Sequence, residues 1–210
     1  MKFLFFKNSS QKDAKTVGFE FLTGAEKNSH NKYLKDIWGY TDQRLELDHA
    51  YIQWIFPLDT PSDHNSLAPV ISKSDIDNLA SEKLKLIQDN MIHSLSIMLH
   101  FYGFCFLKPG EGKLIGRHEY KFSKNKQNWC VMHNHNHLRI TRILKSLRLF
   151  GLEQYAVAFY QALIRAEEEE KREHANELGW LVNPTTLRFW AEAVGDVRPK
   201  EEEIVEQKVF

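Results

Sequence analysis

The stretch EKLKLIQDNMIHSLSIMLHFY, residues 82–102, carries the clearest helical pattern in the chain. Its apolar positions recur at intervals of three and four: Leu84, Ile87, Met91, Leu95, Met98, Leu99 and Tyr102. This spacing puts the apolar side chains on one face of an α-helix, and that face must be buried against other elements. Gly103 follows directly and predicts the end of the helix. We therefore expect a long helix with one buried stripe at the centre of the fold.

Three further helices are expected downstream of this segment. Residues 138–150, LRITRILKSLRLF, repeat the pattern, and Gly151 predicts their C-terminal end. A second helix is expected from residue 152 into the charged run EEEEKREH. A third is expected over Thr185–Val194, after a turn at Asn183-Pro184.

The upstream half gives weaker signals. Asp48 is a good N-cap, and Pro57 cannot continue a helix, so a helix of two turns is expected between them. Residues 58–75 are rich in Pro, Ser and Asp, which predicts a loop, and Ser74-Asp75 start another helical region. Residues 1–47 show turn signals without a clear helical period.

The β signal is confined to the glycine-rich stretch after the long helix. Phe104–Leu107 and Lys113–Ile115 are short β-like pieces, and a small hairpin is plausible there. The predicted fold is mainly α: a single globular helical domain of five or more helices with at most a small β-hairpin. We expect the domain to span residues 1–198 and to be followed by a charged, flexible tail, 199–210.

Composition excludes several classes of protein. The chain has 210 residues, with 42% apolar and 12% aromatic side chains, which excludes a disordered or low-complexity chain. No apolar stretch is long enough to span a membrane, and the run Phe3–Phe6 is too short for a signal peptide. A soluble, cytoplasmic protein is expected. The two cysteines, Cys105 and Cys130, are expected to be buried free thiols.

The formal net charge of zero hides a local excess of cations. Residues 108–150 hold ten Lys or Arg against two Asp or Glu, a net charge of +8, which residues 1–107 and 151–210 offset with −2 and −6. On the helix expected over residues 138–150, the cations Arg139, Arg142, Lys145 and Arg148 fan across the polar half. Such a face suits an anionic ligand or acidic partner, or is simply solvated. Alternatively, the acidic C-terminal helix covers this region within the same fold.

Three histidines alternate along the chain at His133, His135 and His137. Imidazole binds Zn, Cu and Ni, but these side chains would converge only on a strand and would diverge on a helix. No HExxH or CxxC motif accompanies them. Capping or surface hydrogen bonding is therefore favoured over a metal site, and no metal or other cofactor is expected.

The segment DHAYIQWIFP, residues 48–57, allows two interpretations. Asp48 and His49 beside aromatic residues could form a polar site in which His49 carries a proton. Alternatively, Tyr51 and Trp54 anchor the core, and Asp48 or Gln53 supplies hydrogen-bond partners for the Trp N–H and Tyr O–H. The spacing favours the second interpretation.

Several motifs together resemble a known family. They are DHAYIQWIFPLDTP at 48–61, FYGF at 101–104, GRHEYKF at 116–122, QNW at 127–129 and HNHLRITRILKSLRLFGLEQY at 135–155. In this order they resemble the conserved N-terminal domain of the opioid growth factor receptor family. The most specific pieces are Leu138–Leu147 and Tyr51–Pro57, and the resemblance covers about residues 18–165 well. An insertion of about two residues before His135 departs from the family pattern, which weakens a metal site as a family function.

The resemblance implies a receptor-like module. The vertebrate member is described as a receptor for met-enkephalin that restrains cell growth and is associated with the nucleus and its surrounding membranes. Peripheral membrane or perinuclear association is therefore allowed alongside a cytoplasmic location. The vertebrate member also carries a long C-terminal region with repeats, which the present sequence lacks, so a domain-only member is expected.

The leading functional hypothesis is a module that binds a peptide, another anionic ligand or a protein partner. The candidate ligand-binding residues are Tyr51, Gln53, Trp54, Arg117, Arg139, Arg142 and Lys145. The candidates for a polar cluster are Asp48, His49, His135 and Asn136.

Two alternatives come from other classes of protein. One is an enzyme of unrecognised chemistry that gathers Asp48, His49, His135 and Arg117 around one pocket. GxSxG, Walker and GxGxxG signatures are missing from the chain, and neither cysteine has an obvious catalytic context. The other alternative is binding of nucleic acid or an acidic protein through the basic segment 108–150.

Overall fold

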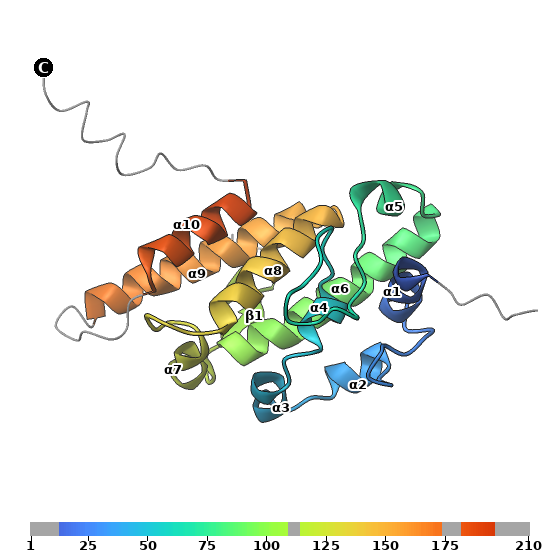
Figure 1. The fold of residues 1–210 in the computed structure, drawn as a ribbon. Helices are drawn as coiled ribbons and strands as arrows, with labels where there is room; N and C mark the ends of the chain where they lie inside the picture. The colour runs from blue at the N-terminus through green and yellow to red at the C-terminus, as the bar shows by residue number, and fades with distance from the viewer. Residues whose placement is uncertain (1–12, 109–113, 174–181, 196–210) are drawn as a thin grey trace, which may run out of the picture.

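The central element is helix α6, which spans Ser81–Tyr102 and runs through the middle of the molecule (Figure 1). The computed structural model describes residues 13–108, 114–173 and 182–195 of the chain. Six of the seven positions in the predicted stripe are buried, and Leu84 is partly buried against the same core. Gly103 ends the helix with a left-handed φ of 89°. A Cβ atom there would lie 2.9 Å from Cα of Phe122, so close packing also requires a glycine.

The downstream helices occupy one side of α6 (Figure 1). They are α8 (Asn136–Leu149), α9 (Glu153–Glu173) and α10 (Pro184–Ala193), which confirms the predicted order. Gly151 adopts a φ of 74° and permits the tight reversal between α8 and α9. Asn183 caps α10, because its side-chain oxygen accepts a hydrogen bond from the backbone N–H of Thr185 at 2.9 Å.

The predicted hairpin is present. Strand β1 (Phe104–Phe106) pairs antiparallel with β2 (Ile115–Arg117), and Phe104 lies opposite Arg117. The second strand begins two residues later than its expected start at Lys113. Gly110 and Gly112, which join the two strands, lie outside the described residues. A short helix, α7 (Phe122–Asn125), and a 3-10 turn, η1 (Lys126–Asn128), follow the sheet.

Three helices lie where the sequence shows only turn signals. They are α1 (Ala14–Leu22), α2 (Leu34–Trp38) and α3 (Asp42–Leu47). Asp13 caps α1 and Thr41 caps α3, each accepting a hydrogen bond from a backbone N–H in the first turn. Helices α2 and α3 have five and six residues, which is too short for a helical period to stand out.

The predicted two-turn helix after Asp48 is wrong. Helix α4 spans only Ile52–Ile55, and Asp48 does not cap it. The Asp48 carboxylate instead accepts a hydrogen bond from the backbone N–H of Ala50 at 2.9 Å, which makes a local turn and delays the start of the helix. Helix α5 (Lys73–Asp77) begins close to the expected position and is capped by Ser72.

The mainly-α prediction is confirmed. Ten α-helices and one two-stranded sheet make up the regular structure of the described residues. Within that part of the chain, each helix is too short or too polar to cross a membrane. The tail 199–210 lies outside the described residues, so the domain boundary at residue 198 stays a prediction.

Candidate functional site

A buried arginine joins α8 to the end of α3. The guanidinium of Arg139 donates hydrogen bonds to the carbonyl oxygens of Leu45 (2.8 Å), Glu46 (3.3 Å) and Asp48 (3.0 Å). It also donates to Oδ1 of Asn136 at 3.1 Å. The last carbonyls of a helix have no partner within the helix, so this cation satisfies the C-terminus of α3. Arg139 is only 5% exposed, and its donors are used inside the fold.

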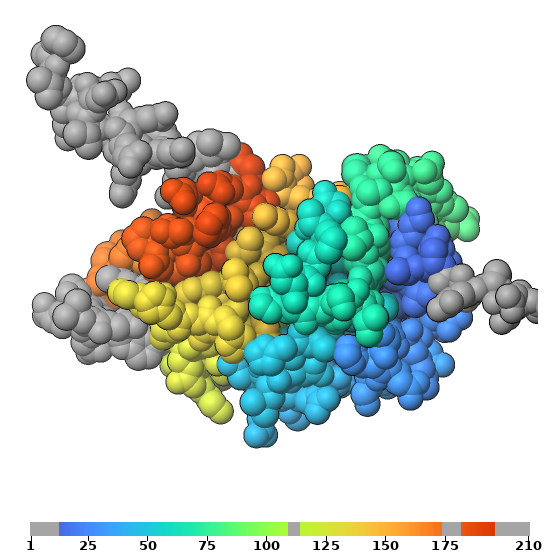
Figure 2. Space-filling view, viewed as in Figure 1, coloured from blue at the N-terminus to red at the C-terminus, as the bar shows by residue number. Residues whose placement is uncertain are grey.

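Two more side chains of α8 bind the same upstream segment. Arg142 donates to the carbonyl oxygen of Phe56 at 3.3 Å, and burial lowers the pKa of Arg142. The Ser146 hydroxyl donates to the carbonyl oxygen of Pro57 at 2.7 Å. Figure 2 shows the resulting seam, where the teal upstream segment meets the yellow part of the chain. Lys145, by contrast, is exposed.

The candidate aromatic wall is part of the core. Tyr51 and Trp54 are each 2% exposed and Gln53 is 4% exposed. The Tyr51 hydroxyl donates to Sδ of Met98 at 3.5 Å, and Nε1 of Trp54 has no acceptor among the described residues. The expectation that Asp48 or Gln53 would serve these two donors is therefore wrong. These aromatic side chains are buried and do not form an exposed wall for a ligand.

Part of the basic segment is neutralised inside the molecule. Arg117 lies 3.0 Å from a carboxylate oxygen of Glu169 and 3.3 Å from one of Glu170. Lys126 also pairs with Glu170, which is 1% exposed. Glu169 and Glu170 both belong to α9, the acidic helix near the C-terminus. The expectation that this helix neutralises part of the basic segment is therefore confirmed for Arg117 and Lys126. Arg117 is fixed on α9 and does not line the pocket described next.

A pocket of about 360 Å³ opens between the loop before α2, helix α3 and the segment after it. It is lined by Asn28, His30, Lys32, Tyr40, Arg44, Leu47, Asp48, His49, Ala50 and Tyr51. A volume of this size suits a small molecule or a short piece of peptide. The segment at the pocket wall, residues 48–51, is the one that Arg139 ties to α8.

A second pocket, of about 450 Å³, lies between α9 and the end of α10. Its lining is mostly aliphatic and aromatic and contains one cation, Arg165. That guanidinium already donates to the carbonyl oxygen of Ile115 at 3.3 Å. The lining of the first pocket therefore contains more polar and charged side chains than that of the second.

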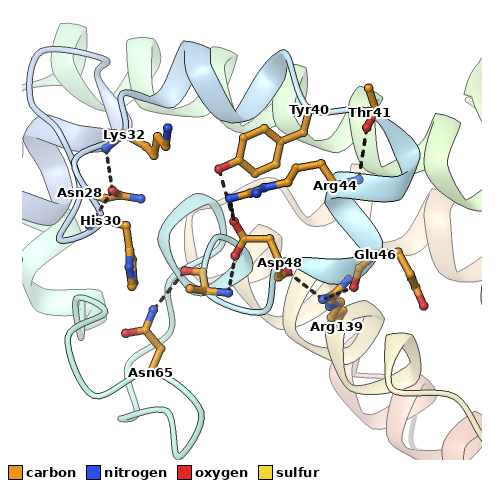
Figure 3. Close-up of polar contacts among 11 residues, drawn as sticks. Asn28, His30, Lys32, Tyr40, Thr41, Arg44, Glu46, Asp48, Asn65 and Arg139 are labelled. Atoms are coloured by element: carbon orange, nitrogen blue, oxygen red, sulfur yellow. Dashed lines mark hydrogen bonds and ion pairs between the residues drawn. The ribbon is translucent and has the colours of Figure 1, made fainter.

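The charged groups of the first pocket lie on two facing sides (Figure 3). On one side, the Asp48 carboxylate accepts hydrogen bonds from the Tyr40 hydroxyl and the Arg44 guanidinium, each at 3.3 Å. Burial and the Asp48 charge raise the pKa of Tyr40, which keeps its hydroxyl a neutral donor. Lys32 and His30 lie on the other side. Because the only carboxylate of the lining is already bonded to Arg44, Lys32 leaves the pocket with an excess of positive charge.

Asn28 supplies a preorganised donor on the same side of this pocket as Lys32 and His30. It is 7% exposed, and its side-chain oxygen accepts hydrogen bonds from the backbone N–H groups of His30 and Lys32, both at 3.0 Å. These two bonds fix the orientation of the amide and direct Nδ2 to the open space (Figure 3). Within the described part of the chain, neither Nδ2 of Asn28 nor Nζ of Lys32 has an acceptor. Two unused donors therefore face one concavity.

The predicted polar cluster is brought together at the edge of the pocket. The rings of His49 and His135 lie 5.2 Å apart, and Nε2 of His135 is 3.4 Å from a carboxylate oxygen of Glu46. Asn136 donates to the other oxygen of Glu46 at 3.0 Å. Burial lowers the pKa of His135. The enzyme hypothesis required Arg117 at the same place. Arg117 instead extends from β2 to α9, where it donates to the carbonyl oxygen of Ala166.

The alternating histidines diverge. His137 is 7% exposed, and its Nε2 lies 2.7 Å from the carbonyl oxygen of Trp129, while His135 faces Glu46. Across residues 13–108, 114–173 and 182–195, no three metal-ligating side chains are grouped to hold an ion.

Seven of the ten lining residues are absent from the sequence-based candidates: Asn28, His30, Lys32, Tyr40, Arg44, Leu47 and Ala50. The run KNSHNK, residues 27–32, mixes cations with turn-forming residues, and this was the only available signal. Its meeting with Arg44 depends on how α2 and α3 pack, which no local pattern specifies.

Comparison with known proteins identifies related chains. Residues 14–204 match the family described as the opioid growth factor receptor (OGFr) conserved region. The chain is 34% identical over 151 residues to the human protein named opioid growth factor receptor, covering 68% of this chain and 21% of that one. It is 36% identical over 118 residues to the rat protein of the same name, covering 56% and 19%. It is also 31% identical over 127 residues to mouse opioid growth factor receptor-like protein 1, covering 59% and 26%.

The matched stretch thus corresponds to about a fifth of the receptors and a quarter of the receptor-like protein. No solved structure matches the chain significantly.

Proposed function

The chain belongs to the opioid growth factor receptor family, and from that premise we propose that it is a ligand-binding domain whose first pocket receives a carboxylate of a peptide. The relatives are named receptors for an opioid growth factor, which supports a peptide as the class of ligand. The site proposed here lies beside the family segment 48–57 and apart from the cations of α8, because Arg139 and Arg142 are used inside the fold.

The observation that carries this proposal is the pair of unused donors. Nδ2 of Asn28 and Nζ of Lys32 face a pocket whose only carboxylate is already bonded. A carboxylate has two oxygens and accepts several hydrogen bonds, so it can meet both donors at once. Arg44 lies across the pocket as a further cation, and His30 and His49 add positive charge when protonated.

The apolar part of the lining indicates what accompanies the carboxylate. Leu47 is 67% exposed at the pocket, and the ring of Tyr40 forms part of the wall. An apolar group beside the ligand carboxylate would cover this surface and gain about 25 cal/mol per Å² of apolar area removed from water. The C-terminal residue of a peptide combines both features in one group.

Calorimetric titration with met-enkephalin and with its C-terminal amide tests the proposal. The free acid should bind about ten- to a hundredfold more tightly, since amidation removes a charge-assisted contact with several donors. Equal affinity of the two peptides, or no binding of either at millimolar concentration, would contradict the proposal.

The variant Asn28→Asp locates the site. The new carboxylate keeps an oxygen that can accept from the N–H groups of His30 and Lys32, so the loop is retained. It replaces the amide donor with a negative charge, and binding of the free acid should be lost. Lys145→Gln is the matched control, because it removes an exposed cation of α8 outside the pocket and should leave the affinity unchanged.

A further inference from the structure

Several lysines of this protein sit beside a carboxylate. Lys15 lies 2.9 Å from Asp75, and Lys83 lies 2.6 Å from Glu20. The same holds for the pairs Lys73–Asp77, Lys85–Asp89 and Lys171–Glu167. A group of neighbouring lysines without such partners in the described residues carries charge that a binding partner can neutralise.

The loop before α2, together with the first turn of that helix, holds such a group. Lys27, Lys32 and Lys35 are all exposed, and among the described residues none of them pairs with a carboxylate. The Lys27 ammonium donates to Oδ1 of Asn31 at 2.9 Å. We call the three lysines the lysine strip. His30 lies within it and also lines the pocket.

Two lysines of the strip contact the same aromatic ring. The ammonium groups of Lys27 and Lys35 lie 5.2 and 5.6 Å from the centroid of the Tyr33 ring. Such cation–π contacts keep two like charges close together while leaving the ammonium groups open to a partner. The flanking carboxylate of Asp36 accepts a hydrogen bond from the backbone N–H of Tyr33 at 2.8 Å and, among the described residues, pairs with none of the three lysines.

Lys32 belongs to the lysine strip and also lines the pocket, so the positive charge of the strip begins at the pocket. We propose that the partner is an acidic peptide segment, with its terminal carboxylate in the pocket and further carboxylates along the lysine strip. This inference rests on the proposed function and adds the charge pattern of the ligand. Complementary charges of this kind speed association and select the partner, and salt screens them.

Two peptides of equal length separate the strip from the pocket. One carries three Glu residues upstream of an apolar C-terminal residue with a free carboxylate, and the other carries Gln at those three positions. At 50 mM salt the Glu peptide should bind about three- to thirtyfold more tightly, the range expected for two or three exposed ion pairs. The advantage should shrink at 200 mM salt.

The double variant Lys27→Gln/Lys35→Gln should abolish most of this advantage and leave the affinity for the Gln peptide unchanged. Its control is Lys124→Gln/Lys145→Gln, which removes two exposed lysines that also lack a carboxylate partner in the described part of the chain and do not line the pocket. Far-UV circular dichroism checks that each variant is folded.

The outcomes distinguish the two proposals. A Glu peptide that binds no more tightly than the Gln peptide would overturn the lysine strip, while the pocket would stand if Asn28→Asp still abolished binding. Equal losses in the two double variants would also overturn the strip. A third outcome would overturn the pocket and support the strip. In that case the Gln peptide does not bind, and the Glu peptide binds only while Lys27 and Lys35 are present.

Discussion

Nη2 of Arg139 lies 3.0 Å from the backbone carbonyl oxygen of Asp48, although the two residues are 91 positions apart in sequence. This hydrogen bond connects two of the motifs that resemble the family, residues 48–61 and 135–155. Asp48 is also the carboxylate of the proposed ligand pocket. The guanidinium therefore acts on the pocket indirectly, because it fixes the backbone of the pocket wall.

Replacing this arginine should destabilise the protein. Arg139→Gln leaves one buried and two partly buried carbonyl contacts without their charged donor, and we expect the free energy of unfolding to fall by about 3 kcal/mol. Urea denaturation measures this change. Lys145→Gln on the same helix should change stability by less than about 0.5 kcal/mol, since that side chain is exposed. Equal losses of stability in the two variants would contradict the distinction between a structural Arg139 and a solvated Lys145.

The internal pairing of opposite charges gives a second prediction. Glu170 is 1% exposed and lies between Arg117 and Lys126, so Glu170→Gln leaves two partly buried cations without their shared carboxylate. The free energy of unfolding should fall by about 3 kcal/mol. Glu168→Gln is the neighbouring control, because Glu168 is exposed and its loss should matter little. A Glu170→Gln variant as stable as the control would show that the acidic helix does not neutralise this region.

Acidification should destabilise the protein as the pH falls below about 6.5. Burial lowers the pKa of His137, and also those of His100 and His135, below the ordinary value of 6.5. The unfolded chain then takes up protons before the folded one, so the stability present above pH 6.5 is lost as the pH falls. Each histidine can contribute at most about 1.4 kcal/mol per pH unit. Asp75, with a pKa lowered to about 2, acts only at much lower pH.

Proton NMR titration and denaturation at several pH values test this prediction together. The His137 ring should titrate below pH 6.5, and His137→Gln should reduce the loss of stability on acidification. A His137 pKa above 6.5, or a protein that becomes more stable as the pH falls from 7 to 5.5, would contradict it.

The sequence identifies the long helices because their apolar faces repeat over several turns. The apolar stripe of α6 and the apolar half of α8 are both predicted in this way, and Gly103 and Gly151 predict where the two helices end. The N-terminal helices were missed because α2 and α3 are short and are defined mainly by their caps. Asp48 was predicted to cap a helix, but an aspartate carboxylate can also accept a hydrogen bond from the backbone N–H two residues later. Here it accepts from Ala50 and forms a turn instead.

The function of individual cations could not be predicted from the pattern of α8. Arg139 and Lys145 look alike on a helical projection, yet one binds three carbonyl oxygens and the other is exposed. What separates them is the position of the end of α3, about 90 residues away in sequence. The polar cluster of His49 and His135 was foreseen as a set, but its neighbours Asn28, Lys32 and Arg44 were not.

Chemical-shift mapping of a peptide carboxylate on the isotopically labelled protein tests the central claim most directly. Met-enkephalin with a free C-terminus should produce saturable shifts in the side-chain amide of Asn28, in the loop 28–32 and at residues 48–50, and its C-terminal amide should produce much smaller ones. Shifts centred on Lys145 and the exposed face of α8, or equal shifts with the acid and the amide, would contradict a carboxylate site in this pocket.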